Sequence, residues 1–295
     1  MAISSVKATI NGATYTLTYN ASTEAYEGTI TAPNKSSYSQ INKYYTVSVT
    51  ALDDYGNSKT VNTSDPDLGD SLKLYVKESV APTISSINPS GGACISNNKP
   101  TISWKCSDDD SGIDQNTIKL YIDDTEVTGT ISVTVSSGVY TCSYIPSEAL
   151  SEGSHTLKFT VSDNDGNTAT QTVTIKVDTV PPVLNVTSPT DGLKTNNSTV
   201  TVVGTTNDVT SSPVTLTING EVVEVGSNGS FSKVLTLSSG TNTITIISTD
   251  GSGKSTTVIK TVYFDDTAPV ISAISLVPNP VDAGKTFVIS VKVTD

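Results

Sequence analysis

Hydrophobic and polar residues alternate along most of this chain, as in "TISWKC" from Thr101 and "VISVKVT" from Val288. This period of two predicts β-strands with one buried face. The chain shows no sustained helical periodicity, and it is rich in Thr, Ser, Val, Ile and Asn, a mixture that favours strands joined by tight turns. We therefore predict an all-β protein.

Two long stretches each carry a complete set of predicted strands. In residues 81–179 the strands are predicted at 83–88, 101–107, 117–122, 130–135, 139–145, 155–162 and 169–177. In residues 180–266 they are predicted at 183–187, 199–204, 213–218, 221–225, 231–237, 242–249 and 255–264. Short strands with frequent turn signals, over roughly 90–100 residues, are typical of an immunoglobulin-like β-sandwich.

Two sequence marks recur along the chain and indicate tandem units. The first is a proline-bearing junction at Pro82, Pro182 and Pro269, at intervals of 100 and 87 residues. The second is a turn that reads "DDYGN", "DNDGN" and "DGSGK", beginning at residues 53, 163 and 250. Glycine in these turns is expected to take a positive φ, and aspartate to close the turn locally.

The two ends of the chain are predicted to be partial units. "SSVKATINGATYTL" from Ser4 aligns with "SSPVTLTINGEVVEV" from Ser211, which holds the third strand of its unit. Residues 1–80 are therefore predicted to be an immunoglobulin-like unit without its first two strands. Residues 267–295 are predicted to be the first two strands of a further unit.

We expect the two partial units to complete each other between subunits, head to tail. Residues 268–295 of one subunit would complete the sandwich begun by residues 1–80 of another by strand addition. The strand positions assigned to this contact are Phe287, Ile289, Val291 and Val293 on one side, and Val6, Ala8 and Ile10 on the other. Truncation of a longer array at both ends is the alternative.

Long stretches resemble bacterial immunoglobulin-like repeats. "SWKCSDDDSGIDQNTIKLYIDD" with "YIPSEALSEGSHTLKFTVSDNDGNTATQTVTIKV" carries the resemblance, as does "TINGEVVEVGSNGSFSKVLTLSSGTNTITIISTDGSG". Such repeats occur on bacterial surface proteins, beside polysaccharide-acting enzymes and on phage virions. The first unit and the stretch "SLVPNPVDAGKTFVISVKVTD" look most like proteins of phages and prophages. The resemblance implies a fold and little about function, because this fold hosts many functions.

The net charge of the chain argues against some classes of binding partner. The chain has 17 Lys plus Arg against 29 Asp plus Glu, a net charge of −12, which argues against nucleic acid and against an anionic membrane. The N-terminal sequence shows no secretory signal, and no apolar stretch is long enough to span a membrane. We expect a virion or extracellular, cell-surface location. Expected partners are other copies of the chain, other virion proteins, or a host cell-surface glycan or protein.

Three functions remain open at this point. The first is a non-enzymatic structural or interaction protein of a phage-like particle, which explains the missing signal. The second is a fragment of a secreted bacterial adhesin or spacer. The third is an accessory carbohydrate-binding module, although a single Trp leaves little to stack on a sugar ring.

Carboxylates gather in two places. "SDDDSGID" supplies Asp108, Asp109 and Asp110, and "SDNDGN" supplies Asp163 and Asp165. Calcium takes six to eight oxygen ligands, so these five are the candidate calcium ligands. The competing interpretation is that these aspartates close turns. No other cofactor is expected.

The remaining candidates point away from catalysis. The single histidine, His155, has no second His or nearby Cys at metal spacing, and it is predicted to be structural at the start of a strand. A candidate recognition loop holds Tyr38, Tyr44 and Tyr45, with a plain connection as the alternative. Cys106 and Cys142 are expected to be buried thiols on the same faces as Trp104 and Tyr144, with a disulfide or a functional thiol as the alternatives.

Overall fold

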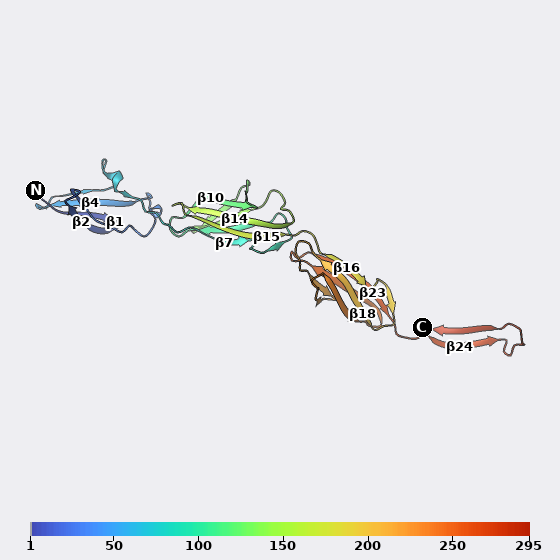
Figure 1. Ribbon diagram of the computed structural model, residues 1–295. Helices are drawn as coiled ribbons and strands as arrows, with labels where there is room; N and C mark the ends of the chain where they lie inside the picture. The colour runs from blue at the N-terminus through green and yellow to red at the C-terminus, as the bar shows by residue number, and fades with distance from the viewer. Residues whose placement is uncertain (1) are drawn as a thin grey trace. The chain divides into compact units, whose positions relative to one another are not determined.

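The computed structural model describes residues 2–295, and its regular elements are β-strands and two short 3-10 helices (Figure 1). Contacts group these residues into two units, one of residues up to 93 with 98–176 and one of residues 94–97 with 177–295. Within the described residues, no helix is long and apolar enough to cross a membrane. The predicted all-β class is confirmed.

The first unit begins with a sheet in the strand order β3-β2-β1-β4-β5, and β6 also pairs with β4. Its elements are β1 (Ile3–Ile10), β2 (Ala13–Asn20), β3 (Ala25–Glu27), η1 (Ser37–Ser39), β4 (Tyr45–Asp53), β5 (Ser58–Val61), η2 (Gly69–Leu72) and β6 (Lys73–Leu74). The described residues before 80 form no second sheet. That this unit lacks its two leading strands stays a prediction.

Residues 83–177 form a two-layer sandwich, called the first-unit sandwich below. One layer has the order β12-β13-β9-β7 and the other β11-β10-β14-β15-β8. The strands are β7 (Thr83–Asn88), β8 (Cys94–Ile95), β9 (Ile102–Ser107), β10 (Ile113–Ile122), β11 (Thr125–Glu126), β12 (Ser132–Ser136), β13 (Val139–Tyr144), β14 (Gly153–Asp163) and β15 (Thr168–Val177). The short strands β8 and β11 were not predicted, since two residues show no alternation.

The second unit contains a similar sandwich. Its layers have the orders β16-β18-β21 and β17-β23-β22-β19-β20, and β17 runs parallel to β23. The strands are β16 (Val183–Ser188), β17 (Leu193–Thr195), β18 (Thr199–Asn207), β19 (Thr215–Ile218), β20 (Glu221–Val223), β21 (Ser230–Thr236), β22 (Gly240–Thr249) and β23 (Ser255–Phe264). A hairpin of β24 (Val270–Val277) and β25 (Val288–Thr294) follows.

The two sandwiches fill equivalent core positions in opposite ways. In the first, Trp104 on β9 lies opposite Cys142 on β13, and its ring centroid is 4.9 Å from that of Phe159. In the second, the position 100 residues later is Gly204 on β18, opposite Phe231 on β21. A Cβ on Gly204 would lie 2.6 Å from Phe231 Cζ. The large aromatic side chain is therefore on β9 in the first sandwich and on β21, the partner of β18, in the second. Either arrangement keeps the core filled.

The recurring turns have the predicted geometry. Gly56, Gly166 and Gly253 take φ values of 88°, 97° and 87°, a region that favours glycine. In the same turns, the aspartate Oδ1 accepts backbone N–H groups from the residues two and four positions later. The turn is therefore closed by the aspartate side chain as well as by the backbone.

His155, at the start of β14, is buried and held on both sides. Its Nδ1 lies 2.7 Å from Asp123 Oδ2, and its Nε2 lies 2.8 Å from the backbone oxygen of Ser151. Both partners accept hydrogen bonds, so the protonated ring can donate to each. The Ser151 hydroxyl is 3.5 Å from the same Nε2, but that nitrogen already faces the nearer carbonyl. Its burial and its two hydrogen bonds are those of a histidine held in the fold, and the structural role of His155 stays a prediction.

We predict that Trp104→Ala destabilises the first-unit sandwich by about 3–5 kcal/mol, because it leaves a large cavity in a filled core. Trp104 is 1% exposed, and the neighbouring Ile102 and Tyr144 are buried as expected. Differential scanning calorimetry should show this transition at a lower temperature and the transition of the second-unit sandwich unmoved. A shift of both transitions together would contradict separate cores.

We also predict a pH dependence centred on His155. Burial alone would lower the pKa of His155, but the hydrogen bonds to Ser151 and Asp123 outweigh it and raise the pKa above its ordinary value of 6.5. A raised folded-state pKa stabilises the fold fully below the unfolded value, and this contribution is lost as the pH rises through the folded value. The urea concentration at the midpoint of unfolding should therefore fall as the pH rises above 6.5. His155→Gln should remove this dependence, and an unchanged dependence in that variant would contradict the assignment.

Candidate metal centre

The turn aspartates place carboxylates at the ends of the sandwiches. Asp163 ends β14, and its Oδ1 accepts N–H groups from Asp165 at 2.9 Å and Asn167 at 2.8 Å. Its Oδ2 accepts the side-chain amide of Asn167 at 2.7 Å. Asp163 is only 2% exposed, and these bonds account for both of its oxygens.

Two other carboxylates lie beside Asp163. Glu78, Asp108 and Asp163 each offer one oxygen, and these oxygens lie within 4.8 Å of one another. Asp108 Oδ1 accepts the N–H groups of Asp110 and Gly112, and Glu78 Oε1 accepts the N–H of Ser111 at 2.7 Å. We call this group the first carboxylate cluster.

The structure brings together only part of the predicted calcium set. Asp108 and Asp163 meet in the first cluster, and Glu78, which sequence reasoning missed, is the third member. Asp110 instead accepts the N–H of Ser36 at 2.9 Å, and Asp165 Oδ2 accepts the N–H of Glu78 at 3.0 Å.

Asp109 stands apart from the cluster. Its side chain is exposed, and its backbone oxygen accepts Lys35 Nζ at 3.4 Å. Lys35 also lines a pocket of about 250 Å³ together with Glu78, Asp108 and Asp109. A positive charge is therefore already present near the first cluster. Of the five candidate aspartates, the structure therefore groups Asp108 with Asp163, and calcium binding stays a prediction.

A second carboxylate cluster was missed from the sequence. Asp178, Asp208 and Asp250 also bring one oxygen each within 4.8 Å of one another, and they are 0%, 6% and 7% exposed. They lie 100, 100 and 87 residues after the members of the first cluster. The repeat intervals were the signal that could have found them, because equivalent positions in tandem units occupy equivalent places.

The candidate recognition tyrosines separate into different environments. Tyr45 is 4% exposed, and its hydroxyl donates to the backbone oxygen of Lys35 at 3.1 Å. It is therefore a core residue and not a contact residue, since β4 turns its ring inward. Tyr44 packs edge-on against Tyr75, and Lys43 Nζ lies 4.1 Å from the ring centroid of Tyr38. Tyr38 and Tyr44 remain partly exposed.

Cys106 and Cys142 are thiols and form no disulfide. Cys106 and Cys142 are buried on neighbouring strands, and Cys94 is half-buried. The expected buried thiols are confirmed over the disulfide alternative. Their packing beside Trp104 makes them small core side chains.

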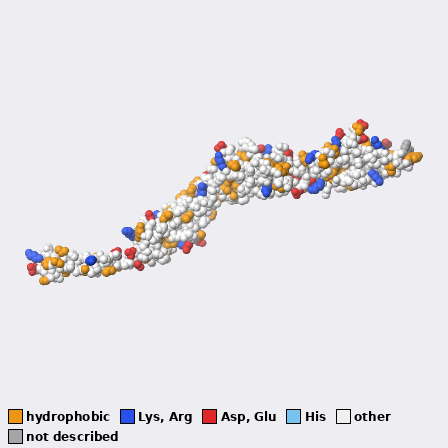
Figure 2. All heavy atoms as spheres, turned by 180° about the vertical axis from the view of Figure 1, so that it is seen from behind, with side chains coloured by type: hydrophobic (Ala, Val, Ile, Leu, Met, Phe, Trp, Pro, Cys, Tyr) orange, Lys and Arg blue, Asp and Glu red, His pale blue; other side chains and the backbone are white. Residues whose placement is uncertain are grey.

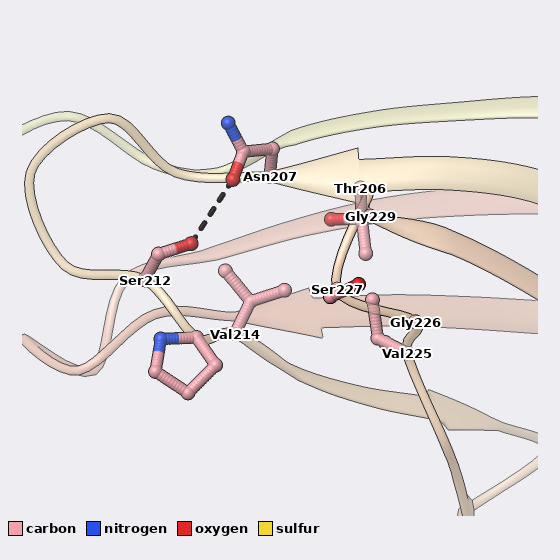
Figure 3. Close-up of a pocket in the computed structure, with 9 residues that line it drawn as sticks. Thr206, Asn207, Ser212, Val214, Val225, Gly226, Ser227 and Gly229 are labelled. Atoms are coloured by element: carbon pink, nitrogen blue, oxygen red, sulfur yellow. Dashed lines mark hydrogen bonds between the residues drawn. The ribbon is translucent and has the colours of Figure 1, made fainter.

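A pocket of about 370 Å³ lies at one end of the second-unit sandwich (Figure 3). Figure 3 shows the side chains of Asn207 and Ser212 facing each other, and the Ser212 hydroxyl donates to Asn207 Oδ1 at 3.0 Å. The residues that line it are Thr206, Asn207, Ser212, Pro213, Val214, Val225, Gly226, Ser227 and Gly229. None of these lining residues carries an acid, a base or a thiol, so the pocket offers hydrogen bonds but no general acid–base group.

Charged side chains are sparse on the surface. Figure 2 shows blue and red groups scattered over a mostly white face, without a broad patch of one sign. This agrees with the low charged fraction of 16%. A surface of hydroxyl and amide groups favours contacts by shape and hydrogen bonding over electrostatic steering.

Comparison with known proteins adds family matches for the two sandwiches. Residues 83–179 match a bacterial Ig-like domain family, and residues 182–266 match glucodextranase domain B. Bacillopeptidase F of Bacillus subtilis (strain 168) is 35% identical over 126 residues, which are 42% of this chain and 9% of that protein. The chain thus spans a small part of the curated relative that it matches.

Solved structures with similar folds are more distant in sequence. The fibronectin(III)-like modules of Clostridium thermocellum CbhA are 18% identical, with a TM-score of 0.40, over 62% of this chain and 94% of theirs. An I-band fragment of titin is 14% identical, with a TM-score of 0.41, over 88% of this chain and 87% of its own. The strand topology described above, together with the two family matches, shows tandem immunoglobulin-like β-sandwiches.

Proposed function

We propose that this chain is a non-catalytic structural or interaction protein that assembles through the exposed apolar face of its β24–β25 hairpin. The observation that carries the proposal is the exposure of the β24–β25 hairpin. Phe287, Ile289, Val291 and Val293 are 45–59% exposed. At the positions 87 residues earlier on β18, Val200 and Val202 are 8% and 0% exposed.

The hairpin has the same construction as the paired strands β16 and β18. Both pairs are antiparallel, and both carry a register shift in their first strand, at Val186/Ser188 and at Ile271/Ala273. In the complete sandwich this pair is covered by a second sheet. An exposed apolar strand face of this kind is an interaction surface.

The first sheet supplies a complementary surface. Strands β1, β2 and β4 occupy the order that β19, β20 and β22 have in the second-unit sandwich, so the sheet of residues 2–80 is the layer that a hairpin like β24–β25 packs on. Ile10 is half-buried, whereas Val6 and Ala8 are 8% and 5% exposed. The contact therefore requires the segments over Val6 and Ala8 to shift, and Ile10 is the accessible member of the three.

The location and the receptor remain predictions from the resemblance. A phage-like particle, a bacterial surface adhesin and a secreted spacer each use tandem units of this fold. The filled cores around Trp104 and around Phe231 support a role as a scaffold, because the scaffold is held by packing and leaves loops and sheet faces for contacts.

We predict that the chain self-associates and that Ile289→Lys combined with Val291→Lys abolishes association, because each lysine places a charge in an apolar contact. Sedimentation velocity over a wide concentration range measures this. Val288→Lys, on the opposite face of the same strand, is the matched control and should still associate. Moving residues 268–295 in front of Met1 should give a monomer. A wild-type chain that stays monomeric at the highest concentration would contradict the proposal.

A further inference from the structure

The second carboxylate cluster is buried and lies within one unit. Asp178 follows β15, Asp208 follows β18 and Asp250 follows β22, so three separate strand ends converge on it. All three side chains are at least nine-tenths buried. Carboxylates are rarely buried unless they are paired or bind a metal.

One oxygen of this cluster has no partner. Asp250 Oδ1 accepts the N–H groups of Ser252 and Lys254 and the hydroxyl of Ser252, at 2.8, 2.9 and 2.8 Å. Asp250 Oδ2 is buried and accepts no hydrogen bond in the described structure. A buried acceptor without a partner is destabilising, and this one belongs to a group that faces two further carboxylates.

The related turns show why this oxygen is left over. Asn57 and Asn167 stand four residues after Asp53 and Asp163, and their side-chain amides donate to Oδ2 at 2.9 and 2.7 Å. At the equivalent place in the second unit, the residue is Lys254. Its backbone N–H keeps the bond to Oδ1, but the amide that would satisfy Oδ2 is missing. The turn is therefore preserved, but Asp250 Oδ2 is left without a hydrogen-bond donor.

Ser211 positions the other two carboxylates. Its backbone N–H donates to Asp208 Oδ1 at 2.7 Å, and its hydroxyl donates to Asp178 Oδ2. Asp208 Oδ1 also accepts the N–H of Thr210 at 2.8 Å, and Asp178 Oδ1 accepts that of Val180 at 3.2 Å. Two side chains from different strand ends are thereby fixed next to Asp250, as a preorganised ligand set requires.

We propose that Asp178, Asp208 and Asp250 bind a calcium ion. A divalent cation supplies the missing partner of Asp250 Oδ2 and offsets the repulsion among three close carboxylates. The donors are oxygens only, which favours Ca²⁺ or Mg²⁺ over zinc. Calcium fits better because a buried site must replace most of the ion's water, and Mg²⁺ gives up water reluctantly.

The first cluster differs in the features that matter. Its Asp163 has both oxygens satisfied, Glu78 accepts the N–H of Ser111, and Lys35 lines the adjoining pocket. Only Asp163 among its members is fully buried. The tight ion is therefore assigned to the second cluster, and the first serves as an internal comparison.

Titration of the full chain with CaCl₂ after EDTA treatment, followed by calorimetry and by the melting temperature, tests the proposal. We expect one tight ion and an upward shift of the melting transition of the second-unit sandwich. Asp250→Asn keeps the Oδ1 acceptor of the turn and should lose the ion. Lys254→Asn keeps all three carboxylates but supplies an amide to Oδ2, and it should weaken calcium binding by about tenfold or more.

Two matched controls separate this site from general effects. Asp53→Asn changes the same turn position where no cluster exists, and Asp163→Asn disrupts the first cluster, so both should retain the tight ion. No heat and no melting shift in the wild-type chain would overturn the proposal, as would full binding by a folded Asp250→Asn variant. An equal shift with MgCl₂ would overturn the choice of calcium.

Discussion

Coverage of each sheet by a second sheet is the constraint on which the rest of this structure depends. Alternating strands have one apolar face, and that face is stable in water only when another layer buries it. In the two sandwiches the cover is complete, and Trp104 and Phe231 fill the space between layers from opposite strands. The Trp104–Cys142 and Gly204–Phe231 pairs show that total volume, and not the residue at one position, is preserved.

The same constraint matters for residues 2–80 and for the β24–β25 hairpin, where a second sheet is missing. The hairpin β24–β25 has its apolar face uncovered within the described residues. The sheet of β1 to β5 has no second sheet packed on it among the described residues, although Val6 and Ala8 on it are buried. A strand face that is buried inside a complete sandwich is exposed when the covering sheet is absent.

The turns add a second level of variation to the repeated scaffold. One aspartate closes each turn through Oδ1, so its Oδ2 is free to take a local amide or another partner. With Asn167 the turn is satisfied internally, and with Lys254 it is not. A single residue four positions along the chain thus separates an aspartate that only closes a turn from one that is available to a cation, without a change of backbone.

The sequence by itself determined the all-β class, the alternating strands and the recurring turns, because periodicity and turn chemistry are local properties. It also identified Trp104 as a core residue and placed His155 at the start of a strand. It could not determine which carboxylates meet: Glu78 joins Asp108 and Asp163 from far along the chain. Nor did local pattern show that Tyr45 points inward. These depend on which strand ends converge, and only the packing of two sheets brings residues so distant in sequence within a few ångströms.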